Sequence, residues 1–196
     1  MKRLDTETRQ ILIKEAVLDI ISTEGMSKLS TKNIALKVGV TEGAIYRHFK
    51  SKKAILLSII LDVYENLVVK QEEIAISNLA PSKKLFTFFC KQIQYLIKNK
   101  GITILLFSEA THSNDSELKK QLLKTLKAQK QLLIKIVQEG IDKNVWDKNL
   151  NLNDFSTLYM GIPVILNIEL ILQKEKFKSD EFCTKMFYLL LKILKK

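Results

Sequence analysis

The chain has 196 residues, with 32 Lys and Arg against 21 Asp and Glu and a formal net charge of +11. This length suits one compact helical unit, or a small head joined to a larger body, and it is enough to bury a real core. The positive charge favours a polyanionic partner, either nucleic acid or an acidic membrane face, although a generally Lys-rich composition gives the same balance.

The two cysteines, Cys90 and Cys183, each lie within an apolar helical pattern. We interpret them as small buried hydrophobic residues rather than a disulfide framework or a metal site, which suits a reducing compartment. The opening residues, MKRLDTETRQ, contain no apolar segment of the signal-peptide kind, and no stretch reaches about 18 uncharged apolar residues. We therefore expect a soluble cytoplasmic protein with no membrane partner.

An enzyme is not expected, because the sequence lacks recognisable catalytic and cofactor-binding motifs. It has two histidines and two cysteines, and it contains no G-x-S-x-G, P-loop or Rossmann motif. No pair of nucleophile and base and no metal cluster can be assembled from these residues. We expect no catalytic residue, no cofactor and no metal.

Apolar residues recur at helical spacing along almost the whole chain, and period-two alternation is absent, so the sequence predicts an all-α fold. The first helix follows a cap at Asp5 or Thr6, and Gly25 closes the segment.

A second, short helix is predicted to begin at Ser30 or Thr31 and to end at Gly39. Thr41 is then a good cap for a seven-residue helix, and Ser51 caps the helix that follows. The chain therefore reads as a helix, a turn, and a very short helix held between its neighbours.

The fourth helix is predicted to be long and to run to a break at Pro81. Five more helices are expected at about residues 83–99, 101–111, 115–140, 153–173 and 179–195. No flexible Gly/Ser linker occurs, so we place the boundary along the fourth helix, with a head of residues 1–53 and a body of residues 54–196.

The stretch VGVTEGAIYRHFKSK, residues 38–52, contains a helix too short to be stable alone. Ile45 and Phe49 form its inward stripe, and the exposed set is Glu42, Gly43, Tyr46, Arg47 and His48. Two short helices joined by a glycine-containing turn are typical of a helix-turn-helix, whose second helix enters the major groove of DNA. Residues 1–53 hold 11 basic and 6 acidic residues, a net charge of +5 that would attract phosphate.

Each exposed residue type suits such an interface. Gly43 lets the backbone approach the duplex closely, Tyr46 and His48 can donate to phosphate, and Arg47 can pair with guanine or phosphate. Lys52 lies in the first turn of the fourth helix, where free backbone N–H groups already favour an anion. The stretch therefore predicts a phosphate clamp around a base-reading helix.

The span TKNIALKVGVTEGAIYRHFKSKKAIL, residues 31–56, resembles the DNA-binding signature of TetR-family transcriptional repressors, G-V-S/T-x-G-x-x-Y-x-H/Y-F-x-x-K-x-x-L. The matching positions are Gly39, Val40, Thr41, Gly43, Tyr46, His48, Phe49, Lys52 and Leu56. The resemblance implies a three-helix DNA-binding head, a six-helix ligand-binding and dimerisation body, and a homodimer on a palindromic operator of double-stranded DNA.

The resemblance also implies residue roles. The positions that commonly hold phosphates are Thr31, Thr41, Tyr46, His48 and Lys52. The positions that face base edges are Glu42, Gly43, Ala44 and Arg47. Many members carry Lys where this chain has Glu42, and a carboxylate can accept from cytosine N4, so the operator sequence does not transfer from relatives.

A small apolar or aromatic effector is expected in the body, because the later helices supply many aromatic residues and few charges. The candidate lining residues are Tyr64, Phe89, Phe107 and Tyr159, and the possible polar anchors are Glu109 and Asn167. Plain core packing is the alternative role for each aromatic residue.

The last two helices carry more apolar surface than one body can cover, which favours a four-helix interface between two copies. The candidate interface residues are Leu158, Gly161, Ile162, Ile165, Ile168, Phe182, Met186, Leu189, Leu190 and Ile193. Two functions stay open: a repressor released by a small molecule, or a DNA-binding protein of the same fold that organises the chromosome or the division machinery.

Overall fold

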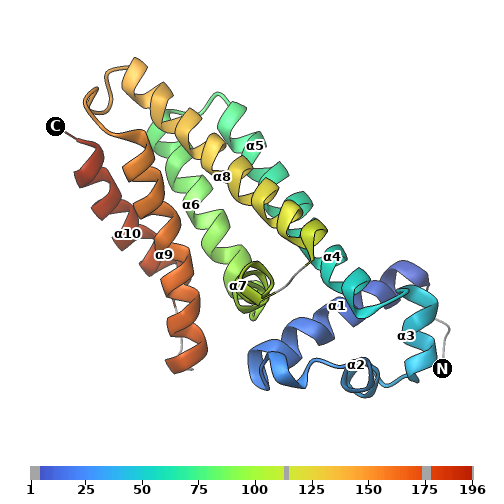
Figure 1. Ribbon diagram of the computed structural model, residues 1–196. Helices are drawn as coiled ribbons and strands as arrows, with labels where there is room; N and C mark the ends of the chain where they lie inside the picture. The colour runs from blue at the N-terminus through green and yellow to red at the C-terminus, as the bar shows by residue number, and fades with distance from the viewer. Residues whose placement is uncertain (1–4, 113–114, 174–177, 196) are drawn as a thin grey trace. The chain divides into compact units, whose positions relative to one another are not determined.

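The computed structural model describes residues 5–112, 115–173 and 178–195 (Figure 1). All regular structure within these ranges is helical, which confirms the all-α prediction. The chain divides into two compact units: the first holds the residues up to Asp62 together with Asn99–Leu122, and the second holds Val63–Lys98 and the residues from Leu123 onward. Every helix in the described ranges is too short or too polar to cross a bilayer. The functional boundary between residues 53 and 54 stays a prediction.

The first unit contains five helices near the N-terminus of the chain and two segments from later in the sequence. In chain order these are α1 (Thr6–Thr23), a 3-10 turn (Met26–Lys28), α2 (Thr31–Val38), α3 (Glu42–His48), α4 (Lys52–Val63), α7 (Ile102–His112) and the start of α8 (Ser116–Asp142).

The predicted helix starts in the first unit are confirmed by hydrogen bonds at each cap. Asp5 accepts from the backbone N–H of Thr8 at 2.8 Å, Ser30 from that of Asn33 at 3.1 Å, and Ser51 from that of Ala54 at 3.1 Å. Each cap satisfies an N–H group that the first turn of a helix leaves without an internal partner.

A shared apolar core holds these short helices. α1 packs against both α2 and α3. The core side chains of α1 to α4 are Ile13, Ala16, Val17, Ile20, Ile21, Ile34, Ala35, Ile45, Ile55, Leu56, Ile59 and Ile60. Tertiary packing of this kind stabilises a seven-residue helix such as α3, which would be marginal in isolation.

α7 packs against α1 within the same unit, a pairing that the sequence did not predict. Gly101 precedes α7 with φ +84°, and a Cβ atom there would lie 2.6 Å from the carbonyl oxygen of Leu18. Only glycine combines this backbone conformation with so close an approach.

The predicted long fourth helix is continuous but not uniform. α4 passes through a π-helical segment, Tyr64–Val68, into α5 (Val69–Ile76), and the backbone keeps helical dihedral angles at both junctions. A π-segment accommodates an extra residue within a helix and is often found at functional sites. The helix ends at Ile76, five residues before Pro81.

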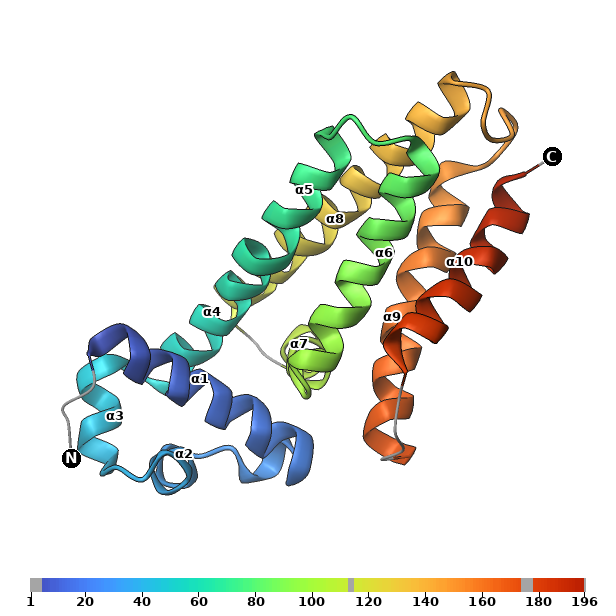
Figure 2. The ribbon, with the colours of Figure 1, turned by 180° about the vertical axis from the view of Figure 1, so that it is seen from behind.

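The second unit consists of α5, α6 (Pro81–Lys98), the rest of α8, α9 (Leu152–Gln173) and α10 (Ser179–Leu194), as Figure 2 shows from behind. Pro81 opens α6, a position where its missing N–H costs nothing. The core is rich in aromatic residues, and Tyr159 lies beside Phe89 with the ring centroids 5.5 Å apart. α6, α8, α9 and α10 agree with the predicted ranges to within about two residues at each end.

A buried lysine ties three helices of this unit together. Lys84 on α6 is 4% exposed, and its ammonium group donates to the carbonyl oxygen of Ala75 on α5 at 3.0 Å and to Glu139 on α8 at 2.6 Å. A buried charge requires partners of this kind. Gly140, the residue after Glu139, makes room for the ring of Trp146, whose Cε3 atom would lie 2.0 Å from an added Cβ.

Candidate nucleic-acid interface

The short helix α3 is fixed at both ends. Gly39 ends α2 in the left-handed conformation at φ 72°, which turns the chain, and Thr41 then accepts from the backbone N–H of Ala44 at 3.2 Å. At the other end the side chain of Gln10 on α1 donates to the carbonyl oxygen of His48 at 3.2 Å. The helix is therefore held rigidly with one face inward through Ile45, which is 1% exposed.

The residues predicted to contact DNA are exposed or half-buried on the surface of α2, α3 and the start of α4. Thr41, Glu42, Gly43, Arg47 and Lys52 are exposed, and half of the Tyr46 surface, 51%, is accessible. Thr31, Ala44 and His48 are half-buried. An added Cβ at Gly43 would meet nothing closer than 4.0 Å, so packing within the chain does not require glycine there. The predicted close approach to DNA at this residue stays a prediction.

Two of the residues predicted to contact phosphate, Thr31 and Tyr46, also contact each other. The hydroxyl groups of Thr31, at the start of α2, and Tyr46, on α3, lie 3.3 Å apart. Sequence reasoning missed this contact, because the two residues are 15 positions apart and the angle between the helices decides it. The pairing orients the tyrosine hydroxyl beside the α2 N-terminus, where free N–H groups favour an anion.

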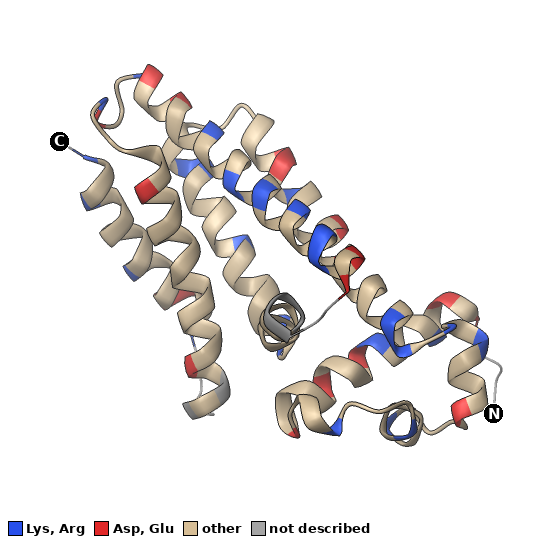
Figure 3. Cartoon of the chain, viewed as in Figure 1, with Lys and Arg blue, Asp and Glu red and all other residues tan. Residues whose placement is uncertain are grey.

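The basic side chains near α3 differ in whether they already form an ion pair within the chain. Within the described ranges Arg47, Lys50 and Lys52 are exposed and form no ion pair. Lys53 is bound at 2.7 Å to Asp115, and this hydrogen bond raises the pKa of the lysine. Lys50 was not among the predicted DNA contacts. Its position in the sequence, between α3 and Lys52, is the signal that could have added this exposed cation to the candidates. Figure 3 shows that lysines also run along α8, so the positive charge is not confined to this face.

His48 carries an unusual polar atom. Its Nδ1 is buried and has no hydrogen-bond partner among the described residues. The other ring nitrogen, Nε2, is the atom that would donate to phosphate in the predicted role of His48.

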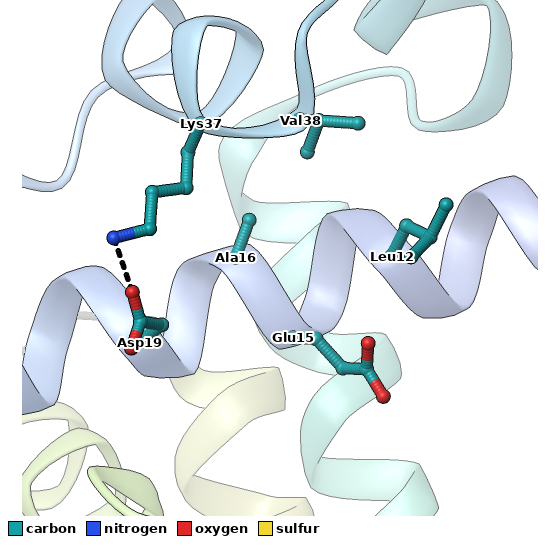
Figure 4. Close-up of a pocket in the computed structure, with 6 residues that line it drawn as sticks. All are labelled: Leu12, Glu15, Ala16, Asp19, Lys37 and Val38. Carbon is teal, nitrogen blue, oxygen red and sulfur yellow. Dashed lines mark ion pairs between the residues drawn. The ribbon is translucent and has the colours of Figure 1, made fainter.

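A shallow pocket of about 290 Å³ lies between α1 and α2 (Figure 4). It is lined by Leu12, Glu15, Ala16, Asp19, Lys37 and Val38. Lys37 forms an ion pair with Asp19, and this pair raises the pKa of the lysine. The charges of Lys37 and Asp19 therefore cancel, and Glu15 gives the pocket lining a net negative charge. None of the residues predicted to bind the effector or DNA lines this pocket.

The candidate effector residues are divided between the two compact units. Phe89, Tyr159 and Asn167 are buried in the second unit, and Tyr64 there lies beneath the ammonium group of Lys124 at 4.6 Å. Phe107 belongs to the first unit and is 65% exposed. Glu109 lies on α7, but its side chain is outside the described part of the structure.

The second unit also buries polar atoms that its own packing does not satisfy. Among the described residues, hydrogen-bond partners are missing for Gln71 Nε2, Gln92 Oε1, Tyr159 OH and Asn167 Oδ1. Burying a polar group without a partner costs about 1–3 kcal/mol, so each such atom requires an explanation. The two glutamines were not predicted, because a glutamine on an amphipathic helix gives no sequence signal of burial.

The candidate dimer residues lie mostly at the surface. The exposed side chains among them are Leu158, Ile165, Ile168, Leu189 and Ile193. Ile162, Phe182 and Met186 are half-buried, and Leu190 is buried in the core of its own chain. Val164, Leu172 and Tyr188 extend the exposed apolar surface of α9 and α10.

Residues 13–59 match the sequence profile described as "Bacterial regulatory proteins, tetR family". Over 130 residues the chain is 31% identical to the nucleoid occlusion factor SlmA of Haemophilus ducreyi, which covers 63% of this chain and 62% of that protein. Over 141 residues it is 28% identical to the fatty acid metabolism regulator protein of Bacillus subtilis, covering 72% of this chain and 71% of that protein. The chain thus spans less than two thirds of the SlmA protein.

Solved structures share the fold along nearly the whole chain. FadR from Bacillus subtilis, a transcriptional regulator solved in complex with stearoyl-CoA, superposes with a TM-score of 0.75 at 23% identity, covering 92% of this chain and 97% of that one. FadR from Bacillus halodurans gives a TM-score of 0.78 at 19% identity, with 97% of each chain covered.

Proposed function

Because the chain belongs to the TetR family of DNA-binding transcriptional regulators, we propose that it is a repressor that binds a palindromic operator as a homodimer and is released by a small molecule. The observation that carries the proposal is the rigid α3 helix, which buries Ile45 and exposes a continuous polar face from Thr41 to Arg47. In this proposal the chain acts in the cytoplasm and has no catalytic activity.

The exposed face of α3 divides into two roles. Arg47, which forms no ion pair within the described chain, would read a base edge, because a guanidinium group can pair with guanine in the major groove. Tyr46, Lys52 and the α2 N-terminus beside Thr31 would hold phosphates and set the position of α3 on the duplex.

The test compares two variants on operator fragments selected from genomic DNA by the full chain. Tyr46→Ala should weaken binding to all sequences alike, whereas Arg47→Ala should relax the base preference by about 1–3 kcal/mol at one position of each half-site. A mobility-shift series in which both variants keep the affinity and preference of the original chain would refute this interface.

The homodimer is supported by exposed apolar surface on two neighbouring helices. Leu158, Ile165 and Ile168 on α9 and Leu189 and Ile193 on α10 are each between 44% and 57% exposed. Apolar surface of this extent on one face is typical of a protein interface. A two-fold pairing would place two α3 helices in successive major grooves about 34–36 Å apart. Light scattering should report a dimer at micromolar concentration.

The effector is proposed to be a fatty acyl chain with a polar head, such as an acyl-CoA thioester. The similarity to FadR proteins, one of which was solved with stearoyl-CoA, motivates this choice of ligand. Four buried polar atoms without partners in the second unit support it, because the thioester and amide groups of such a ligand could satisfy them. The candidate lining then includes Phe89, Gln92, Tyr159 and Asn167.

Release from DNA requires coupling between the two sites. The continuous helix from Lys52 through the π-segment to Ile76 begins at the proposed phosphate clamp and ends in the second unit, so it is the natural carrier of that coupling. A coupling free energy of about 1–3 kcal/mol would weaken operator binding roughly 5- to 150-fold, and the operator must weaken ligand binding by the same factor.

The ligand proposal is tested by titrating stearoyl-CoA into the protein by calorimetry, with and without bound operator. Weaker binding in the presence of operator is expected. Equal affinities in the two titrations would refute induction by this ligand, and mass spectrometry of molecules that copurify with the protein would then identify the class of ligand to test.

A second function is favoured by the 31% identity to a nucleoid occlusion factor over 130 residues. A protein of that kind would use the same α3 interface at many chromosomal sites. Mapping the bound sites across the genome separates the two functions: a few sites beside promoters support a repressor, and many dispersed sites support a chromosome-organising role.

A further inference from the structure

α6 and α10 pack side by side in opposite directions within the second unit (Figure 2). Phe86 on α6 meets Phe187 on α10 edge to face, with ring centroids 5.0 Å apart. Phe89 stacks on Phe182 at 6.5 Å. These two contacts establish the register of the antiparallel pair: moving forward along α6 corresponds to moving backward along α10.

The register brings the two cysteines of the chain together. Cys90 follows Phe86 by four residues, and Cys183 precedes Phe187 by four residues, so the two lie one helical turn further along the same seam. Cys183 is buried and Cys90 half-buried, and both pack in the same apolar core. The influence of each thiol on the other raises the pKa of Cys90 and lowers that of Cys183, as expected for two sulfurs at the same level of the seam. The sequence contains no third cysteine to compete for either sulfur.

We propose that Cys90 and Cys183 form a reversible dithiol–disulfide site that ties α6 to α10. This site needs neither DNA nor an effector, so it goes beyond the proposed function. The core packing confirms that both cysteines lie among hydrophobic residues, and the proposal adds a redox role to that interpretation.

The reaction requires a two-electron oxidant, and a hydroperoxide supplies it. One thiolate attacks the peroxide, so that an S–O bond forms, the O–O bond breaks and the departing oxygen leaves as water or alcohol. The second sulfur then attacks the sulfenic acid, so that the S–S bond forms and the sulfenic oxygen leaves as water with the second thiol proton. Two thiols and one peroxide thus give one disulfide, and an external thiol restores both cysteines.

The link would constrain much of the second unit. It closes a loop of 94 residues, from Cys90 through Cys183, that contains α7, α8 and α9. α6 carries Phe89 and Gln92 of the candidate effector site, and α10 carries part of the candidate dimer face. Oxidation would therefore keep the helices that bear these two sites from separating.

The test uses the full chain, first fully reduced and then treated with hydrogen peroxide. Thiol titration should fall from two groups per chain to none, and peptide mapping without reductant should find the Cys90 and Cys183 peptides joined within one chain, with both thiols restored by dithiothreitol. Thiols that stay free, a link only between chains, or sulfinic acid without any disulfide would each overturn the proposal.

Thermal unfolding supplies a second measurement. Oxidation should raise the midpoint of the original chain by about 5 °C or more, because a disulfide that closes so long a loop restricts the unfolded state strongly. Cys90→Ser serves as the matched control, since its half-buried position tolerates a hydroxyl, and its midpoint should not rise on oxidation. A disulfide that forms in the original chain without any rise would refute the tether between α6 and α10.

Discussion

Replacing Lys52 by alanine should reduce the salt dependence of DNA binding and leave the base preference unchanged. Lys52 is exposed at the start of α4 and forms no ion pair with a described residue, so its charge is available to a phosphate. Each lysine–phosphate contact on duplex DNA releases about 0.9 counterion, and a dimer has two such contacts, so the slope of log K against log salt should fall by about 1.8. Between 50 and 200 mM salt, the original chain should lose about 12-fold more affinity than the variant.

The neighbouring residue provides the control. Lys53 has the same side chain, but its ammonium group is bound to Asp115 at 2.7 Å and lies 3.4 Å from Glu117. Lys53→Ala should therefore change the slope by less than half as much. The assay is fluorescence anisotropy on one operator fragment at four salt concentrations. Equal slope changes for the two variants would show that only net charge matters and would refute the assignment of a specific contact to Lys52.

Two further predictions concern the stability of the second unit. Gly140→Ala should destabilise the protein by about 2–3 kcal/mol in chemical denaturation without DNA, because the new Cβ would overlap the ring of Trp146 at 2.0 Å, whereas Gly43→Ala, whose Cβ would meet nothing closer than 4.0 Å, should not. Glu139 accepts hydrogen bonds from two ammonium groups, those of Lys143 and Lys84. These bonds lower the pKa of Glu139 in the folded protein, so its contribution is complete above its ordinary value of 4.5 and is lost as the pH falls through the lowered value. Glu139→Gln should cost about 2 kcal/mol at pH 7 by leaving Lys84 with a weaker partner, and the difference from the original chain should shrink by pH 3; an equal difference at both pH values would contradict this account.

Much of the architecture follows from local sequence signals. The caps at Asp5, Ser30, Thr41 and Ser51 were predictable because each side chain bonds an N–H group only three residues ahead, so neighbours in the chain decide it. The turn at Gly39 is local in the same way. The face of α3 follows from helical periodicity, so the sequence could predict which side chains point outward.

The candidate interface shows where local prediction ends. The sequence motif singled out Lys52 and gave no role to Lys53, and only the fold supplies a physical difference between the two charges, because Asp115 reaches Lys53 from a distant part of the chain. In the same way the contact between Thr31 and Tyr46 depends on the angle at which α2 and α3 cross.

The sequence by itself therefore determined the all-α class, the capped helix starts near the N-terminus and the polar face of α3, since these depend on interactions within about one helical turn. Tertiary structure alone decided that α7 packs on α1 through Gly101, and that α6 and α10 bring Cys90 and Cys183 to the same level of one seam. Such contacts depend on the register between helices far apart in the chain. That register is set by how bulky side chains such as Phe86 and Phe187 interlock, and no periodic pattern within either helix encodes it.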